Sequence, residues 1–66
     1  MQICVNGHPQ DVPDLISVAD LLVNMSIEKK RIAIELNQEI IPRGKHSETL
    51  LKEGDEIEVI HAIAGG

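Results

Sequence analysis

The carboxyl group of Gly66, at the end of the run Ala62-Ile63-Ala64-Gly65-Gly66, is the group in this sequence best placed to do chemistry. Glycine has no Cβ, so its backbone adopts conformations closed to other residues and can pass through a narrow channel. A terminus outside a sheet is also accessible to a partner. The run therefore predicts a tail that enters another protein's active site. Gly-Gly endings also occur in termini without any role, so the rest of the chain must decide between these interpretations.

No other residues have the spacing of a catalytic or metal site. Ser17 and Ser47 lack a matched base, and a single cysteine, Cys4, cannot build a zinc site. The histidines also lack metal-binding spacing: His8, His46 and His61. The run His46-Ser47-Glu48 carries acid–base groups, but neighbours in a loop rarely point into one pocket. We therefore expect no bound cofactor, no metal and no enzymatic activity of the chain alone.

The size and composition predict one small soluble domain. A chain of 66 residues allows a single domain, and a hydrophobic content of 42% supplies one core. One cysteine excludes an intrachain disulfide and favours a reducing compartment. The first residues do not resemble a signal peptide, and no apolar run approaches the roughly 20 residues that span a bilayer. We expect a cytoplasmic protein with no membrane partner.

The charge of the chain restricts its partners. The net charge is −5 and there is no Phe, Trp or Tyr. Phosphates repel such a chain, which also lacks stacking platforms for bases, so we expect no nucleic-acid partner. Acidic residues concentrate late in the sequence, at Glu53, Asp55, Glu56 and Glu58. Beside the tail they could steer the domain onto a basic partner, or they could simply keep it soluble.

The elements that would position the tail begin with a hairpin. Met1, Ile3 and Val5 alternate with polar residues, which predicts a half-buried strand. The pair Asn6-Gly7 is typical of a tight hairpin turn, because both residues tolerate positive φ. A short second strand should follow at about residues 10–12, where the neighbouring prolines confine it to a sheet edge.

A helix should follow the hairpin. The Ser17 hydroxyl can cap its first turn, and Asp20 completes a pattern that resembles a capping box. Apolar residues then recur at helical spacing and form one stripe: Val18, Leu21, Leu22 and Met25. The helix should end near residues 24–26.

Strands make up most of the remaining sequence. Alternation predicts a third strand at about residues 31–36, and Ile40-Ile41 forms a brief fourth strand. Between this strand and the last, Leu50-Leu51 should insert a loop into the core. The last strand, from residue 56 to about 63, has apolar residues on both sides of its later half. This pattern indicates an inner strand covered on more than one side, or a bulge.

These elements predict an α+β protein with a β-grasp, ubiquitin-like fold, in which a mixed sheet of four to five strands packs on one main helix. The helix must cover the apolar face of the sheet. The last strand can pair with the first in parallel, because the intervening helix serves as a crossover. We expect a β-grasp domain over residues 1–63 and a flexible C-terminal tail over residues 64–66.

Several segments match the pattern of one protein family. They are Met1-Gln2-Ile3 with Asn6, Val18-Ala19-Asp20-Leu21-Leu22, the run from Ala33 to Arg43, Gly54-Asp55-Glu56-Ile57, and the run from Ala62 to Gly66. Over essentially its whole length the chain resembles the ThiS family, the bacterial sulfur carriers of thiamine (thiazole) biosynthesis. The middle and final segments are the most specific. The absence of aromatic residues departs from many members and bears on partner contacts, not on the tail chemistry.

The resemblance implies chemistry at Gly66. An E1-like (ThiF-like) adenylyltransferase would use ATP, with Mg²⁺ held by that partner, to convert the Gly66 carboxylate into an acyl-adenylate. A sulfur donor such as a cysteine desulfurase system would supply a persulfide sulfur, which leaves a thiocarboxylate as covalent sulfur on Gly66. A ThiG-like thiazole synthase would receive this sulfur for the thiazole ring of thiamine.

The resemblance and the position of the tail also assign partner contacts. The candidate partner-binding residues are Gly65, Ala64, Ile63, Glu56, Glu58 and Arg43. The first two would thread the partner's channel, where a larger side chain would clash. Ile63 would anchor the base of the tail, or would simply be the last core residue of its strand.

Three other functions fit the same ending. One is a sulfur donor similar to the small subunit of molybdopterin synthase, and another is a ubiquitin-like modifier that forms isopeptide bonds with lysines. The third is an interaction module with a chemically silent tail.

Overall fold

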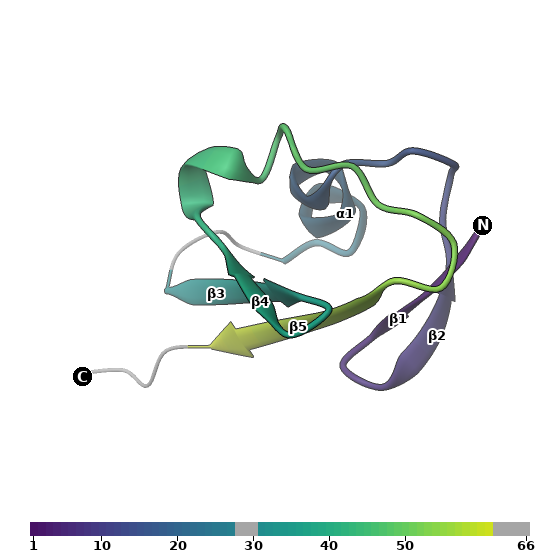
Figure 1. Ribbon diagram of the computed structural model, residues 1–66, viewed down its shortest axis with the longest axis horizontal. Coiled ribbons are helices and arrows are strands. Elements are labelled where there is room, and N and C mark those ends of the chain that lie inside the picture. The colour runs from purple at the N-terminus through teal and green to yellow at the C-terminus, as the bar shows by residue number, and fades with distance from the viewer. Residues whose placement is uncertain (28–30, 62–66) are drawn as a thin grey trace.

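The computed structural model describes residues 1–27 and 31–61, which form a five-stranded sheet and one α-helix. The elements in chain order are β1 (Gln2–Val5), β2 (His8–Asp11), α1 (Val18–Asn24), β3 (Ile32–Leu36), β4 (Glu39–Ile41), the 3-10 helix η1 (Arg43–Lys45) and β5 (Glu56–His61). Figure 1 shows α1 against one face of the sheet. The predicted mixed sheet packed on one main helix is confirmed.

The first and last strands pair at the centre of the sheet. The strand order is β2-β1-β5-β3-β4, and β1 pairs with β5 in parallel while the other neighbours are antiparallel. This parallel pair is the one that the sequence predicts. As a result, the strand that leads to Gly66 has neighbours on both sides.

One hydrophobic core lies between α1 and the sheet. The side chains of the strands alternate, and the buried ones are Ile3 and Val5 of β1, Ile32 and Ile34 of β3, and Ile57 and Val59 of β5. The fully buried large side chains are Ile3, Val18, Leu21, Leu22, Ile34, Leu51 and Ile57. Leu51 inserts the loop before β5 into this core, as predicted. The prediction for Leu50 is wrong, because its side chain is 53% exposed.

The start of α1 follows its predicted capping. The Ser17 hydroxyl accepts a hydrogen bond from the Asp20 N–H at 3.0 Å. At the other end, Met25 is the C-cap residue and its N–H donates to the Leu21 carbonyl. The predicted helix boundaries are therefore confirmed.

The second strand begins earlier than predicted. It runs from His8 and includes Pro9, which lies opposite Cys4. Proline is tolerated there because β2 is an edge strand and its outer side needs no ladder hydrogen bond. The third and fourth strands agree with the prediction to within one residue.

The prediction that β5 is covered on more than one side is wrong. Ile57 and Val59 point into the core, but Ile60 points to the other face and is 43% exposed. In the described part of the chain, the α-helix packs against one face of the sheet and the other face is left without a helix (Figure 1). The described part of β5 ends at His61, so the predicted end of the strand at residue 63 lies outside the described residues, as does the predicted tail at residues 64–66.

Candidate functional site

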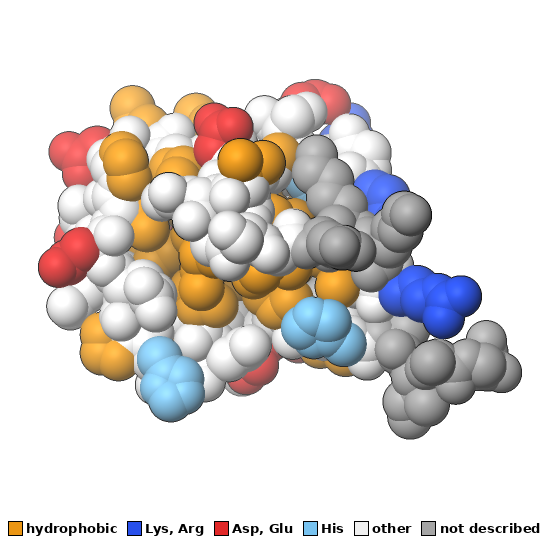
Figure 2. Space-filling model, turned by 180° about the vertical axis from the view of Figure 1, so that it is seen from behind, with side chains coloured by type: hydrophobic (Ala, Val, Ile, Leu, Met, Phe, Trp, Pro, Cys, Tyr) orange, Lys and Arg blue, Asp and Glu red, His pale blue; other side chains and the backbone are white. Residues whose placement is uncertain are grey.

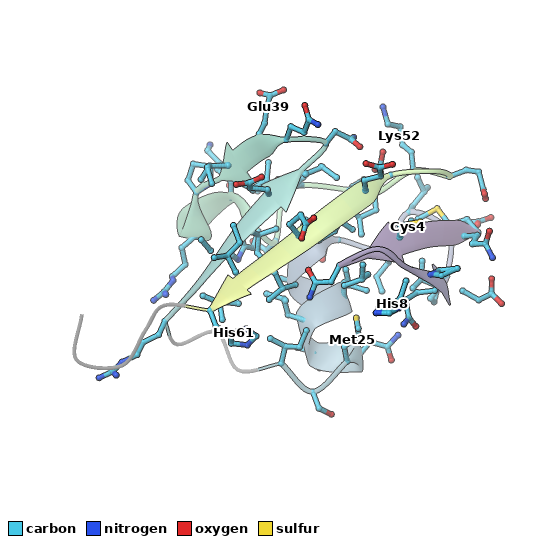
Figure 3. The ribbon with its side chains drawn as sticks, turned by 90° about the horizontal axis from the view of Figure 1, so that it is seen from below. Cys4, His8, Met25, Glu39, Lys52 and His61 are labelled. Carbon is cyan, nitrogen blue, oxygen red and sulfur yellow. The ribbon has the colours of Figure 1, made fainter. Side chains whose placement is uncertain are left out.

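The predicted reactive residue Gly66 and the predicted contact residues 63–65 lie outside the described residues. The structure does describe the element that leads to them. Figure 3 shows His61 at the tip of β5, the central strand of the sheet. The candidate site is therefore built from β5, from the hydrogen bonds that hold it, and from the sheet face beside it.

The start of β5 is held by side chains from two loops. Asp55 is only 5% exposed, and its carboxylate accepts hydrogen bonds from the Lys52 N–H at 2.7 Å and from Asn37 Nδ2 at 3.1 Å. The Oδ1 atom of Asn37 accepts a hydrogen bond from the Glu56 N–H at 3.0 Å. These bonds together fix the position at which the strand begins.

The later half of β5 is held by Asn6. β1 ends at Val5, whose partner in β5 is Ile57. Beyond this pair, Asn6 Oδ1 accepts a hydrogen bond from the Val59 N–H at 2.8 Å, and the Asn6 N–H donates to the Ile57 carbonyl at 2.8 Å. The sequence identified Asn6 as a turn residue and as part of a family-like segment. No local pattern points to Val59, because the two residues are 53 positions apart.

The sheet face opposite α1 carries acidic and apolar side chains side by side. Glu35 lies directly across from Glu58, and Ala33 lies across from Ile60. Ile40 of β4 lies across from Glu35 on its other side. An open groove on this face is lined by Cys4, Gly7, Glu35, Gln38, Glu56, Ile57 and Glu58. Figure 3 shows this face, with β5 in front and α1 behind.

Among the described residues that line it, the groove has carboxylates and no cationic side chain. Like charges directly across from each other destabilise a sheet pair, and Glu35 and Glu58 have this arrangement. Neither carboxylate has a cationic partner among the described residues. The same face exposes Ile40 (60%) and Ile60 (43%). A partner surface with a basic group and an apolar group would relieve both features.

The structure brings together two of the three predicted interface residues that it describes. Glu56 and Glu58 line the groove. Arg43 is exposed in η1, after the edge strand β4, and does not line it. Sequence reasoning missed Glu35 and Ile40. A signal for Glu35 was present, because its strand alternates and places it on the face opposite to the apolar residues.

Exposed apolar side chains also occur on the α1 side of the sheet. Leu15 is 66% exposed and Val23 is 70% exposed. Both line a shallow groove together with Asp14 and Asp20. Figure 2, which shows the molecule from behind the view of Figure 1, has hydrophobic side chains gathered in the middle of the visible face. Exposed apolar side chains of the described chain are thus not confined to the sheet face that carries the acidic groove.

His46 is buried and bonded to the backbone of the domain. It is 4% exposed, and its Nε2 donates to the Ile41 carbonyl at 3.2 Å, since a carbonyl can only accept. Its Nδ1 has no partner among the described residues. Ser47 and Glu48 are exposed, so the three neighbours do not converge on one pocket.

The described ranges 1–27 and 31–61 lack two further features. They contain no group of three or more side chains that could hold a metal ion. None of their helices combines the length and the apolar character that crossing a membrane requires.

A comparison with protein families shows to which family the chain belongs. The family model described as "ThiS family" matches residues 3–66. The chain belongs to the ThiS family. The resemblance seen in the sequence motifs is therefore confirmed, and the match extends through the two final glycines.

Solved structures and curated relatives agree with membership of the ThiS family. The crystal structure of the thiamine biosynthesis protein ThiS from Geobacter metallireducens superposes with a TM-score of 0.88, at 30% identity over 100% of both chains. The sulfur carrier protein ThiS of Escherichia coli is 30% identical over 100% of both chains. The Bacillus subtilis ThiS is 36% identical over 53 residues, which are 80% of each chain. The β-grasp fold is thus shared with ThiS.

A ThiS-like segment also occurs within longer relatives. A thiazole synthase of Magnetococcus marinus is 33% identical over 66 residues, which are 100% of this chain and 20% of that protein. The chain thus spans about a fifth of the length of the thiazole synthases that it matches.

Proposed function

We propose that this chain is a sulfur carrier of thiamine biosynthesis, and that Gly66 is the residue that carries the sulfur. The observation that supports this most directly is the match to the ThiS family model through Gly66. Relatives from two bacteria are named sulfur carrier protein ThiS. In this proposal the chain is a protein co-substrate and not an enzyme by itself.

The proposed loading has three steps. An oxygen of the Gly66 carboxylate attacks the α-phosphorus of ATP on an E1-like adenylyltransferase, and pyrophosphate leaves. The terminal sulfur of a persulfide, from a donor such as a cysteine desulfurase system, then attacks the Gly66 carbonyl carbon and displaces AMP. Finally a thiol reductant supplies two electrons that cleave the resulting S–S bond. Gly66 then carries a thiocarboxylate, and the Mg²⁺ that accompanies ATP belongs to the partner.

The receiving enzyme in this proposal is a thiazole synthase. Support comes from the thiazole synthases in which a segment similar to this chain is part of the same polypeptide. Covalent attachment raises the effective concentration of sulfur at the receiving site. Gly66 follows His61 by five residues, which can reach at most about 17 Å. Each partner must therefore dock beside the end of β5.

The open sheet face is the surface that meets this requirement. It contains β5 itself, and Glu56 and Glu58 with the exposed Ile60 give it both charge and apolar area. We place the partner interface there, with Ala64 and Gly65 entering the partner's channel and Ile63 anchoring the base of the tail. Arg43 lies outside the groove, so it contributes to this interface less than the two glutamates do.

Intact-protein mass spectrometry tests the proposal. Incubation with the E1-like partner, ATP and a sulfur donor should add about 16 Da, because sulfur replaces one carboxylate oxygen. Omission of ATP is the matched control and should leave the mass unchanged. Deletion of Gly66 should abolish the shift and leave the thermal unfolding midpoint unchanged.

Other outcomes of the same measurement distinguish the alternatives. Absence of the heavier species would reject the sulfur-carrier proposal, and adducts with lysines of other proteins would favour a modifier. Transfer of the sulfur to a molybdopterin synthase large subunit, and not to thiazole synthase, would favour the molybdopterin alternative.

A further inference from the structure

The two neighbours of β5 stop pairing with it on different sides, and each leaves part of β5 without a partner strand. β1 is parallel to β5 and ends at Val5, across from Ile57, so the residues of β5 after Ile57 lack a β1 neighbour. β3 is antiparallel and ends at Leu36, also across from Ile57, so Glu56 lacks a β3 neighbour. Each departure leaves a backbone N–H of β5 without its ladder partner.

An asparagine replaces the missing partner in both places. Asn6 and Asn37 are the first residues after β1 and β3, and both have positive φ, at 51° and 50°. The Oδ1 atom of Asn6 accepts the Val59 N–H at 2.8 Å, and the Oδ1 atom of Asn37 accepts the Glu56 N–H at 3.0 Å. Asparagine suits this position because it tolerates the left-handed conformation and carries a carbonyl that substitutes for a backbone acceptor.

The two bonds hold different parts of β5, one at its first residue and one in its later half. Asn37 holds the first residue of the strand, whereas Asn6 holds Val59, two residues before His61. Val59 is 7% exposed, so water cannot readily replace the bond to Asn6. Among the described bonds between the β1 side and β5, this is the one that lies nearest to the residues leading to Gly66.

We infer that Asn6 is a positioning residue for the sulfur-carrier reaction, because its side chain fixes the direction in which β5 delivers Gly66 to a partner's active site. This inference rests on the proposed function. Asn6 does not touch the reacting atoms; it acts through Val59. Without its bond, the end of β5 is held on the β3 side only, and Gly66 spends less time in the reacting position.

Kinetics can separate positioning from docking. Among the described residues Asn6 bonds Val59 and Ile57 and none of the carboxylates of the groove, so we expect loss of its side-chain bond to leave partner affinity intact. The reaction within the complex should slow. A change in kcat without a change in KM is therefore the expected signature.

Three variants isolate the bond. Asn6→Gly removes the acceptor and still permits φ of 51°, while the backbone bond from residue 6 to the Ile57 carbonyl remains. Asn6→Asp keeps a side-chain oxygen as acceptor and should restore the bond. Asn37→Gly is the control at the start of β5, where it removes the bond to the Glu56 N–H together with the bond from Asn37 Nδ2 to Asp55.

The experiment combines amide hydrogen exchange with loading kinetics on the full chain, E1-like partner, ATP and sulfur donor. Asn6→Gly should speed exchange of the Val59 amide by roughly tenfold or more, and should lower kcat for thiocarboxylate formation by about tenfold with KM within about twofold. Asn6→Asp should recover most of both losses. Asn37→Gly should speed exchange at Glu56 and leave kcat unchanged.

Several results would overturn the inference. One is unchanged Val59 exchange in Asn6→Gly, and another is an equal fall in kcat for Asn37→Gly, which would indicate a general loss of stability. A rise in KM alone would mean that Asn6 serves docking. If the wild-type chain is not loaded at all, the proposed function fails and the inference fails with it, although the exchange data would still show whether the bond forms.

Discussion

At the scale of single residues, positive φ angles decide how the turns of this domain are built. Asn37 and Gln38 form the turn between β3 and β4 with φ of 50° and 73°. Two successive positive φ values are typical of the hairpin turn that prefers Asn-Gly. Asn37 suits its place, and its side chain also bonds Glu56. Gln38 carries a Cβ in a conformation that favours glycine, so this turn holds local strain.

We predict that Gln38→Gly stabilises the domain by about 0.5–1 kcal/mol, because glycine relieves the strain at φ of 73°. The measurement is the free energy of unfolding in a denaturant titration. Gln38→Ala keeps the Cβ and is the matched control, which should show no gain. Equal stabilisation by alanine would mean that the glutamine side chain, and not its backbone, is unfavourable.

At the scale of elements, the stability of α1 comes from its N-terminal cap and its packing, because the helix is short. It has only seven residues, which is too short to be stable alone in water. The Ser17 hydroxyl satisfies one N–H of the first turn, and the buried stripe of Val18, Leu21 and Leu22 attaches the helix to the sheet. The cap therefore stabilises the element that covers the whole core.

We expect Ser17→Ala to lower the free energy of unfolding by about 1 kcal/mol, because the Asp20 N–H loses its acceptor. Thermal or chemical unfolding monitored by circular dichroism checks this value. Ser47→Ala changes an exposed serine for which no side-chain bond is described, and it should have an effect within about 0.5 kcal/mol. Similar losses in both variants would contradict a capping role for Ser17.

At the scale of the whole molecule, the two faces of the sheet differ in what they contact. One face packs against α1 and supplies the core, whereas the other leaves three glutamates in an open groove beside β5. The net charge of −5 strengthens the negative potential of this groove. Charge of one sign at an interface mainly affects the rate of association and the choice of partner. Salt screens this electrostatic attraction.

We predict that Glu58→Gln raises KM for loading by the E1-like partner by roughly threefold or more at low salt and leaves kcat unchanged, because the groove loses a charge. The difference from the wild type should shrink as ionic strength rises. Glu48→Gln removes the same charge from a residue outside the groove and should leave KM nearly unchanged. Equal effects of the two variants would show that only net charge matters.

Local patterns predicted most of the fold. Alternation located the strands, and Ser17 with Asp20 marked the start of α1 to the residue. The boundary of β2 was less accurate, because tolerance of Pro9 depends on an edge position that only the assembled sheet defines. Leu50 shows the same limit, because a short apolar run does not reveal which of two leucines points inward.

The candidate site was predicted in part. Glu56 and Glu58 were identified from their position near the tail, and both line the groove. Glu35 was not, because its place across from Glu58 depends on the register between strands 23 positions apart. Asn6 was recognised as a turn residue, but its bond to Val59 needs β1 and β5 to be neighbours.

The sequence by itself determined the order of the elements, the single helix with its cap, the ThiS-like motifs and the prediction of chemistry at Gly66. These features depend on neighbouring residues, whose periodicity and conformational preferences are readable along the chain. Only the tertiary structure decided that Ile60 is exposed, that Glu35 opposes Glu58 and that Asn6 holds β5. Alternation assigns each side chain to a face of its own strand, but which strands become neighbours, and in which register, is set by packing of the complete sheet against α1.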